Sequence, residues 1–186
     1  PKPMSRAEQN KQRAATQEEA ASSISSAFLT DKKSDESDQQ STSSLIITSS
    51  VLPEGEHIPN QYTCNSTNEG DEEDVSPPLQ WDNAPSGTKS FALIFEDPDA
   101  LGGTFVHWVI YNIPSDVTAF EEAIPPIGIL ANGTKQGIND FGNLGYGGPC
   151  PAPAGKIHTW VFKLYAIDIE VTLDPGATKP ELMNLI

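Results

Sequence analysis

The chain has 186 residues, and its 26 Asp and Glu against 11 Lys and Arg give it a formal net charge of −15. This excess of acidic residues excludes generic attraction to nucleic acid or to an anionic membrane surface, because both require an excess of Lys and Arg. The apolar stretches are shorter than the ~20 residues that a membrane helix needs, so no transmembrane segment is expected.

Residues 1–44 are rich in Ser, Gln, Ala, Glu and Lys, with only scattered apolar residues. Such a segment cannot bury enough surface to offset its ordering entropy, which predicts a disordered Ser/Gln-rich tail. The chain does not begin with Met, and its first residues lack a basic segment followed by an apolar one. We therefore expect an incomplete N-terminus and favour a cytoplasmic location, with a periplasmic or secreted protein as the alternative.

The ordered part is expected to begin with a strand at residues 45–51, which read LIITSSV. Residues 53–88 are dominated by Pro, Gly, Asn and acidic residues, which predicts long loops. Within them, the prolines of residues 76–81, SPPLQW, suit the edge of a sheet better than its interior.

Two apolar runs at residues 91–95 and 105–111 predict a hairpin with a long acidic loop. Alternation places Asp97 on the face of Phe91, Leu93 and Phe95, and it places His107 on the face of Phe105, Val109 and Tyr111. If the antiparallel register makes these faces coincide, Asp97 and His107 project to the same side near the loop. A slip of one residue would separate them.

The last third of the chain contains a long Gly- and Pro-rich loop at residues 133–155, a strand at 158–169 and the start of a helix. The pattern T-x-x-E from Thr178 to Glu181 is typical of a capping box. Because this helix would stop after about two turns, the domain at 45–186 is expected to be truncated at its C-terminus. Short strands and little helix predict a mainly antiparallel β-sandwich with small peripheral helices.

The two cysteines, Cys64 and Cys150, are too few for a disulfide scaffold and lack the spacing of a zinc site. Nothing in the sequence brings them together, so two free thiols are favoured. No serine lies in a G-x-S-x-G motif, and no base is assigned to Cys150 by the sequence. The sequence therefore predicts no catalytic nucleophile.

Asp97, His107 and His158 lie near predicted strand ends beside loops. Two imidazoles and a carboxylate could grip a phosphate-like or carboxylate group, with Asp97 orienting one ring. The same residue types occur in two-His, one-carboxylate metal sites, although such ligands usually lie closer together in sequence. Three separately satisfied side chains are the ordinary alternative. Spacing alone leaves these alternatives open.

Five sequence blocks resemble the phosphatidylethanolamine-binding protein family, also called the Raf kinase inhibitor-like proteins. The resemblance is to the bacterial and cyanobacterial branch, and the blocks follow one another in the order of the family. The blocks are DPDA at 97–100, VHW at 106–108, YNIP at 111–114, GINDFGNLGYGGPCP at 137–151 and H-x-W-x-F-x-L-Y-A-x-D at 158–168. The resemblance covers about residues 45–186 and implies a β-sandwich with a small pocket for phosphate-type anions.

By this resemblance, Asp97, His107 and His158 would line the pocket, and Phe105 and Trp160 would be its aromatic walls. Gly148, Pro149 and Cys150 would form the rim and offer backbone donors. The chain departs from the family at Leu101, where a proline is usual, and at Trp160, where many members have a tyrosine. The family's closing helix and last strand are also missing beyond Ile186.

The sequence and the resemblance together lead to a non-enzymatic protein that binds a small anionic ligand, phosphate or a phosphorylated head group, without a metal or other cofactor. A protein partner such as a kinase or protease is the expected target of any regulation. The alternative is a hydrolase or metal-dependent enzyme that uses the same residues. A third hypothesis is a vestigial pocket on an acidic surface that contacts other proteins.

Overall fold

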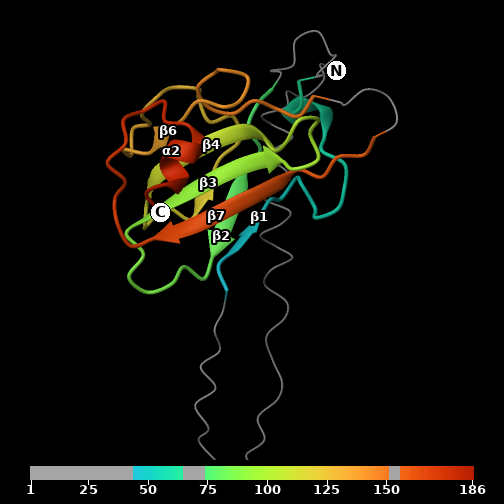
Figure 1. The fold of residues 1–186 in the computed structure, drawn as a ribbon. Coiled ribbons are helices and arrows are strands. Elements are labelled where there is room, and N and C mark those ends of the chain that lie inside the picture. The colour runs from blue at the N-terminus through green and yellow to red at the C-terminus, as the bar shows by residue number, and fades with distance from the viewer. Residues whose placement is uncertain (1–43, 65–73, 151–155) are drawn as a thin grey trace, which may run out of the picture. The chain divides into compact units, whose positions relative to one another are not determined.

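The structure is a computed structural model that describes residues 44–64, 74–150 and 156–186. Its strands form two antiparallel sheets (Figure 1), which confirms the predicted mainly β architecture. A three-stranded sheet has the order β1-β2-β5, and a four-stranded sheet has the order β6-β4-β3-β7. The strands are β1 (Ile46–Thr48), β2 (Leu79–Asp82), β3 (Ser90–Asp97), β4 (Phe105–Pro114), β5 (Ala119–Phe120), β6 (Lys135–Gln136) and β7 (Val161–Ile167).

Two short helices complete the described elements, the 3-10 helix η1 (Asn60–Tyr62) and the α-helix α2 (Lys179–Met183). The predicted tail at 1–44 lies outside the described residues apart from its last residue. Among the described helices none is long and apolar enough to cross a membrane.

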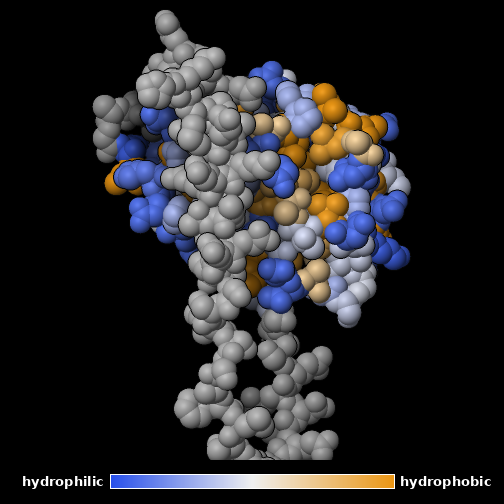
Figure 2. All heavy atoms as spheres, turned by 180° about the vertical axis from the view of Figure 1, so that it is seen from behind, coloured by the Kyte–Doolittle hydropathy of each residue, from blue (hydrophilic) through white to orange (hydrophobic). Residues whose placement is uncertain are grey.

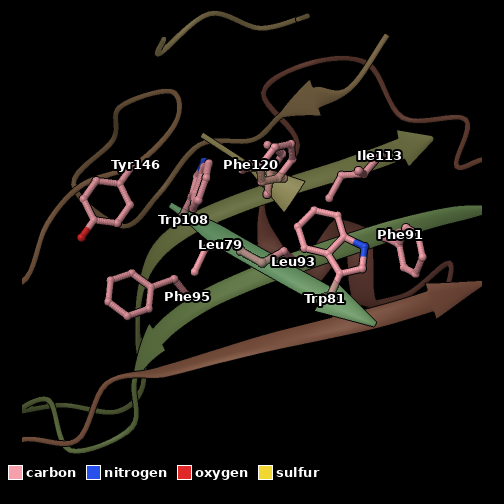
Figure 3. Close-up of a cluster of buried hydrophobic side chains, with 10 residues drawn as sticks. Leu79, Trp81, Phe91, Leu93, Phe95, Trp108, Ile113, Phe120 and Tyr146 are labelled. Carbon is pink, nitrogen blue, oxygen red and sulfur yellow. The ribbon is translucent and has the colours of Figure 1, made fainter. Parts of the chain in front are cut away.

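The main hydrophobic core contains buried residues of both sheets (Figure 3). Trp81 on β2 makes edge contacts with Phe91 on β3 and Phe120 on β5, at ring-centroid distances of 5.8 and 5.3 Å. The complete buried cluster is Leu79, Trp81, Phe91, Leu93, Phe95, Trp108, Ile110, Ile113, Phe120 and Tyr146. The alternate residues of β3 that the sequence placed on one face therefore provide the inner face of this sheet.

The opposite face of the four-stranded sheet is covered by the C-terminal segment. Helix α2 begins with the predicted capping box between Thr178 and Glu181, and its Leu182 is fully buried. Glu96 on β3 pairs with Lys179 of α2 and with Lys163 of β7. Because both of its faces are covered, every residue of β3 is buried.

The pairing of β3 with β4 contains two irregularities, and the one between Phe95 and Glu96 shapes the site. Phe95 pairs with Trp108 and Glu96 pairs with Val106, so His107 is an extra residue without a partner on β3. A bulge of this kind places two successive residues on the same side of a strand. His107 and Trp108 consequently both contact Phe95.

This bulge corrects one part of the sequence prediction. Asp97 and His107 do lie on the same side, as expected, but Val109 and Tyr111 belong to the buried cluster on the opposite face. Strict alternation was wrong beyond His107 because the extra residue reverses the sense of the alternation. The described surface seen from behind carries both hydrophilic and hydrophobic residues (Figure 2), as the surfaces of folded proteins commonly do.

Candidate functional site

A pocket of about 250 Å³ opens where the loop after β3, the start of β4 and the segment before β7 meet. The structure brings together in this pocket the three residues that the sequence singled out, Asp97, His107 and His158. The full lining set is Asp97, Ala100, Leu101, Phe105, His107, Phe141, Cys150 and His158. Leu101, at the position where the family usually has proline, is 76% exposed at the mouth.

Asp97 and His158 form a direct pair in the pocket wall. The His158 Nδ1 atom lies 2.6 Å from Asp97 Oδ2, and both side chains are more than nine-tenths buried. The other carboxylate oxygen accepts a hydrogen bond from the Asp99 amide at 2.8 Å. Asp99 in turn accepts one from the Thr159 amide at 2.8 Å, which ties the DPDA loop to the segment before β7.

The second ring nitrogen of His158 lacks a hydrogen-bond partner among the residues that the structure describes. Its Nε2 atom is buried and makes no hydrogen bond within the described part of the chain. Because Nδ1 donates to Asp97, Nε2 is an acceptor when the ring is neutral and a donor when the ring is protonated. A buried polar atom without a partner is uncommon in folded proteins and calls for an explanation.

His107 is held by the backbone of Gly147 in both directions. Its Nδ1 lies 2.8 Å from the Gly147 carbonyl oxygen, and the Gly147 amide donates to the His107 carbonyl at 2.9 Å. The carbonyl can only accept, so Nδ1 carries the proton. Burial lowers the pKa of His107 below its ordinary value of 6.5, and the contact with Gly147 and the negative charge of Asp97 oppose this shift only in part. At neutral pH the ring is therefore uncharged, and Nε2 is an acceptor.

Two phenylalanines form the aromatic side of the pocket. The rings of Phe105 and Phe141 lie 4.7 Å apart between centroids, and both contact the His107 ring, at 5.1 and 5.6 Å. A side chain at Gly147 would place its Cβ 2.7 Å from the Phe141 ring, so only glycine fits there without displacing that ring. The sequence analysis missed Phe141 and Gly147, although both lie in the block at 137–151 that carried the family resemblance.

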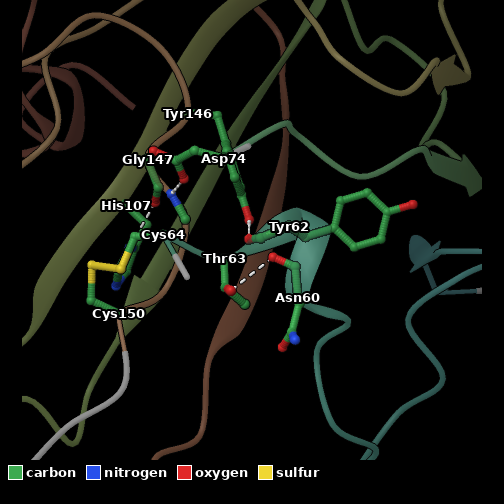
Figure 4. Close-up of a disulfide and its surroundings, with 10 residues drawn as sticks. Asn60, Tyr62, Thr63, Cys64, Asp74, His107, Tyr146, Gly147 and Cys150 are labelled. Atoms are coloured by element: carbon green, nitrogen blue, oxygen red, sulfur yellow. Dashed lines mark hydrogen bonds between the residues drawn. A yellow bond between two sulfur atoms is a disulfide. The ribbon is translucent and has the colours of Figure 1, made fainter. Parts of the chain in front are cut away.

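Cys150 lines the pocket and forms a disulfide with Cys64, with Cα atoms 5.2 Å apart (Figure 4). The prediction of two free thiols was therefore wrong. Hydrogen bonds between segments distant in sequence bring the cysteines together. The Cys64 amide donates to the Pro149 carbonyl at 3.1 Å, and Tyr146 Oη donates to the Tyr62 carbonyl at 2.7 Å. No local sequence pattern reveals such contacts.

Two of the three residues expected at the rim, Gly148 and Pro149, do not offer a backbone donor to the pocket. The Gly148 amide donates to the Asp74 carboxylate, and Pro149 has no amide hydrogen. Neither residue belongs to the lining set. Trp160 also lies outside this set: it packs against the main core and its ring contacts that of His158 at 5.8 Å. Trp160 therefore supports His158 from behind and is not a wall of the cavity.

Within residues 44–64, 74–150 and 156–186, no Lys or Arg side chain lines the pocket. Both arginines of the chain, Arg6 and Arg13, lie in the segment before residue 44. Elsewhere, Lys163 and Lys179 are engaged by Glu96. The charge of the lining residues is thus set by Asp97 and by the protonation of the two histidines. Within the described ranges, no group of three or more His, Cys, Asp or Glu is arranged to hold a metal ion.

The fold and the pocket define a class of protein: two antiparallel sheets that support a small aromatic-walled cavity with a carboxylate–imidazole pair. Residues 48–186 match the profile of the family described as phosphatidylethanolamine-binding protein. The chain belongs to this family, and the resemblance drawn from the sequence blocks is confirmed.

Relatives of this chain occur in archaea and bacteria. A UPF0098 protein of Methanothermobacter thermautotrophicus is 50% identical over 127 residues, which cover 68% of this chain and 79% of the relative. The UPF0098 protein YbhB of Escherichia coli is 37% identical over 136 residues, covering 71% and 84%. The crystal structure of E. coli YbcL, described as a new member of the mammalian PEBP family, has a TM-score of 0.68 and 34% identity, covering 76% of this chain and 88% of YbcL.

Proposed function

We propose that this protein is a non-enzymatic binding protein whose pocket accepts a small phosphate-type anion. One observation carries the proposal: the buried Nε2 of His158 has no partner within the described residues, while its ring is held by Asp97 in the pocket wall. A protonated His158 would turn this nitrogen into a donor, and an oxyanion in the pocket would supply the missing acceptor. The family's name, which refers to a phosphorylated lipid, supports the same ligand chemistry.

The size of the pocket supports a small ligand. About 250 Å³ is less than the 300–1,000 Å³ of typical sites for drug-sized molecules. A phosphate group with a short substituent is of the right size, with the substituent passing Leu101 at the mouth. A bound phosphorylated partner, such as a kinase or protease segment, could enter in this way, and such a partner is the proposed route to regulation.

Isothermal titration with inorganic phosphate tests the proposal with a matched pair of variants. In His158→Asn the amide replaces Nδ1 and can keep the bond to Asp97, but nothing remains at Nε2. In His158→Gln the amide nitrogen reaches the position of Nε2. A hydrogen bond to a charged group contributes about 1.5–3 kcal/mol, so His158→Asn should weaken binding by about 10- to 100-fold. His158→Gln should recover part of the loss.

Asp82→Asn on β2 is the control, because Asp82 is exposed and belongs to the other sheet. It should bind as the unmodified protein does. Equal phosphate affinity in His158→Asn and the unmodified protein, or no binding of phosphate by either, would exclude this pocket as the anion site.

A second candidate function is hydrolysis. The Asp97–His158 pair, at 2.6 Å, has the arrangement in which a carboxylate orients an imidazole that acts as a general base. Ester and phosphoester substrates, assayed with the purified protein and with Asp97→Asn, separate the two functions. Turnover that is lost in Asp97→Asn would favour the enzyme, and so would a stoichiometric metal found by elemental analysis.

A further inference from the structure

We propose that the pocket selects oxyanions that carry a proton, so that it binds hydrogen phosphate and protonated phosphate monoesters but discriminates against sulfate and phosphodiesters. This inference rests on the proposed function and specifies its ligand class. It follows from the hydrogen-bonding capacity of two residues that both line the cavity, Asp97 and His107.

His107 offers the ligand an acceptor. Its Nδ1 hydrogen is donated to the Gly147 carbonyl at 2.8 Å, so in the neutral ring Nε2 has only a lone pair to offer. A fully ionised oxygen placed against that lone pair would meet a second acceptor and form no hydrogen bond. A P–OH group in the same place would donate.

Asp97 adds a second acceptor to the same wall. Its oxygens accept from His158 Nδ1 at 2.6 Å and from the Asp99 amide at 2.8 Å. A carboxylate accepts from a P–OH group but repels an oxygen that has no proton. Both acceptors therefore favour an anion that brings its own hydrogen.

The charge of the lining residues disfavours the fully ionised form of a phosphate monoester, although it does not separate hydrogen phosphate from sulfate, which carry the same charge. Asp97 contributes one negative charge, and among the described residues no Lys or Arg side chain lines the pocket. His107 is faced by Asp97 from β3, by the Asp74 carboxylate behind the Gly147–Gly148 segment, and by the His158 ring in the lining set. A described lining that contains a carboxylate but no Lys or Arg cannot offset the second charge of an ionised monoester with a surplus of positive charge.

The test measures binding of four anions to the full chain at pH 7.0 and 8.0 by isothermal titration. Inorganic phosphate and sulfate are similar in shape, and only phosphate keeps a proton throughout this range. Phenyl phosphate is a monoester that loses its second proton with a pKa of about 6. Dimethyl phosphate is a monoanion without an ionisable proton, and it represents the phosphodiester of an intact phospholipid.

We expect inorganic phosphate to bind at least 10-fold more tightly than sulfate or dimethyl phosphate at both pH values. Relative to inorganic phosphate, phenyl phosphate should lose about 10-fold in affinity between pH 7.0 and 8.0, because its protonated fraction falls by that factor. Titration of a histidine would affect every anion, so the ratio to inorganic phosphate isolates the proton on the ligand.

The variant Asp97→Asn replaces one acceptor by a group that can donate, and it should raise sulfate affinity relative to phosphate by several-fold. Asp82→Asn makes the same change of charge on the other sheet and should leave the ratio unchanged. Equal binding of phosphate and sulfate would overturn the inference while the anion pocket itself stands. Equal binding of phosphate and dimethyl phosphate would do the same and would indicate a lipid head group. Failure of phosphate to bind at all would overturn the proposed function together with the inference.

Discussion

The disulfide between Cys64 and Cys150 provides a stability prediction that can be worked out from the structure. The two residues are separated by 86 positions, so the bond closes a long loop in the unfolded chain. The chain-entropy relation for a loop of this length gives roughly 4.5 kcal/mol. Since domains of this kind are stable by only about 5–15 kcal/mol, loss of the bond should remove a large share of the stability.

The perturbation is the double variant Cys64→Ala/Cys150→Ala, compared with the oxidised protein. Urea denaturation should show a lower midpoint and a free energy of unfolding reduced by about 3–5 kcal/mol. The phosphate affinity should fall as well, because Cys150 lines the pocket and the neighbouring Gly147 carbonyl holds His107. A thiol assay should detect no free thiol in the oxidised protein and two after reduction.

A reducing agent provides the control, since it should shift the midpoint of the unmodified protein and leave the double variant unchanged. A stability difference below about 1 kcal/mol would refute the reasoning. It would mean that the hydrogen bonds from Cys64 to Pro149 and from Tyr146 to Tyr62 constrain these segments sufficiently without the covalent bond.

Three further predictions concern the sheet and its cover. Leu182→Ala should reduce the unfolding free energy by about 2–5 kcal/mol in urea denaturation, because Leu182 is fully buried. For Glu96, burial alone would raise the pKa, but Lys163 and Lys179 outweigh it and lower the pKa below 4.5. The ionised Glu96 thus stabilises the fold above about pH 4.5, and this stabilisation is lost as the pH falls through the lower pKa of the folded state. Glu96→Gln should therefore reduce the loss of stability at acid pH in a stability–pH curve. Because the pKa of His107 is lowered in the folded protein, its neutral ring contributes its full stabilisation above about pH 6.5, and this stabilisation is lost as the pH falls through the pKa of the folded state. His107→Gln should remove this pH dependence from the stability–pH curve. An unchanged curve would contradict the lowered pKa of His107.

The elements with strong local patterns could be predicted from the sequence. The alternating apolar residues of β3 and the capping box of α2 both appear as expected. The β7 strand begins at Val161, later than the predicted residue 158, so His158 and Trp160 precede it in an extended segment. Asp97 and His158 were expected to line one pocket, but their direct pairing across 61 positions was not predicted.

The features that the sequence could not reveal depend on contacts between distant segments. The disulfide requires the end of η1 to lie beside residues 147–150, and the occupied amide of Gly148 depends on Asp74. Trp160 was expected in a wall of the pocket, but its side chain packs against the main core and its ring contacts that of His158. The bulge at His107 was also not predictable, since VHW reads as three ordinary strand residues.

The surplus residue in β4 has a consequence for how this protein can change over time. Deleting His107 would remove one of the two interruptions of the ladder with β3, because a bulge leaves its extra residue unpaired. The same deletion would remove the acceptor on which the proposed ligand selectivity depends. Variants selected only for thermal stability should therefore include some that lack the bulge in β4 and no longer bind a ligand. Variants selected for ligand binding should keep the bulge.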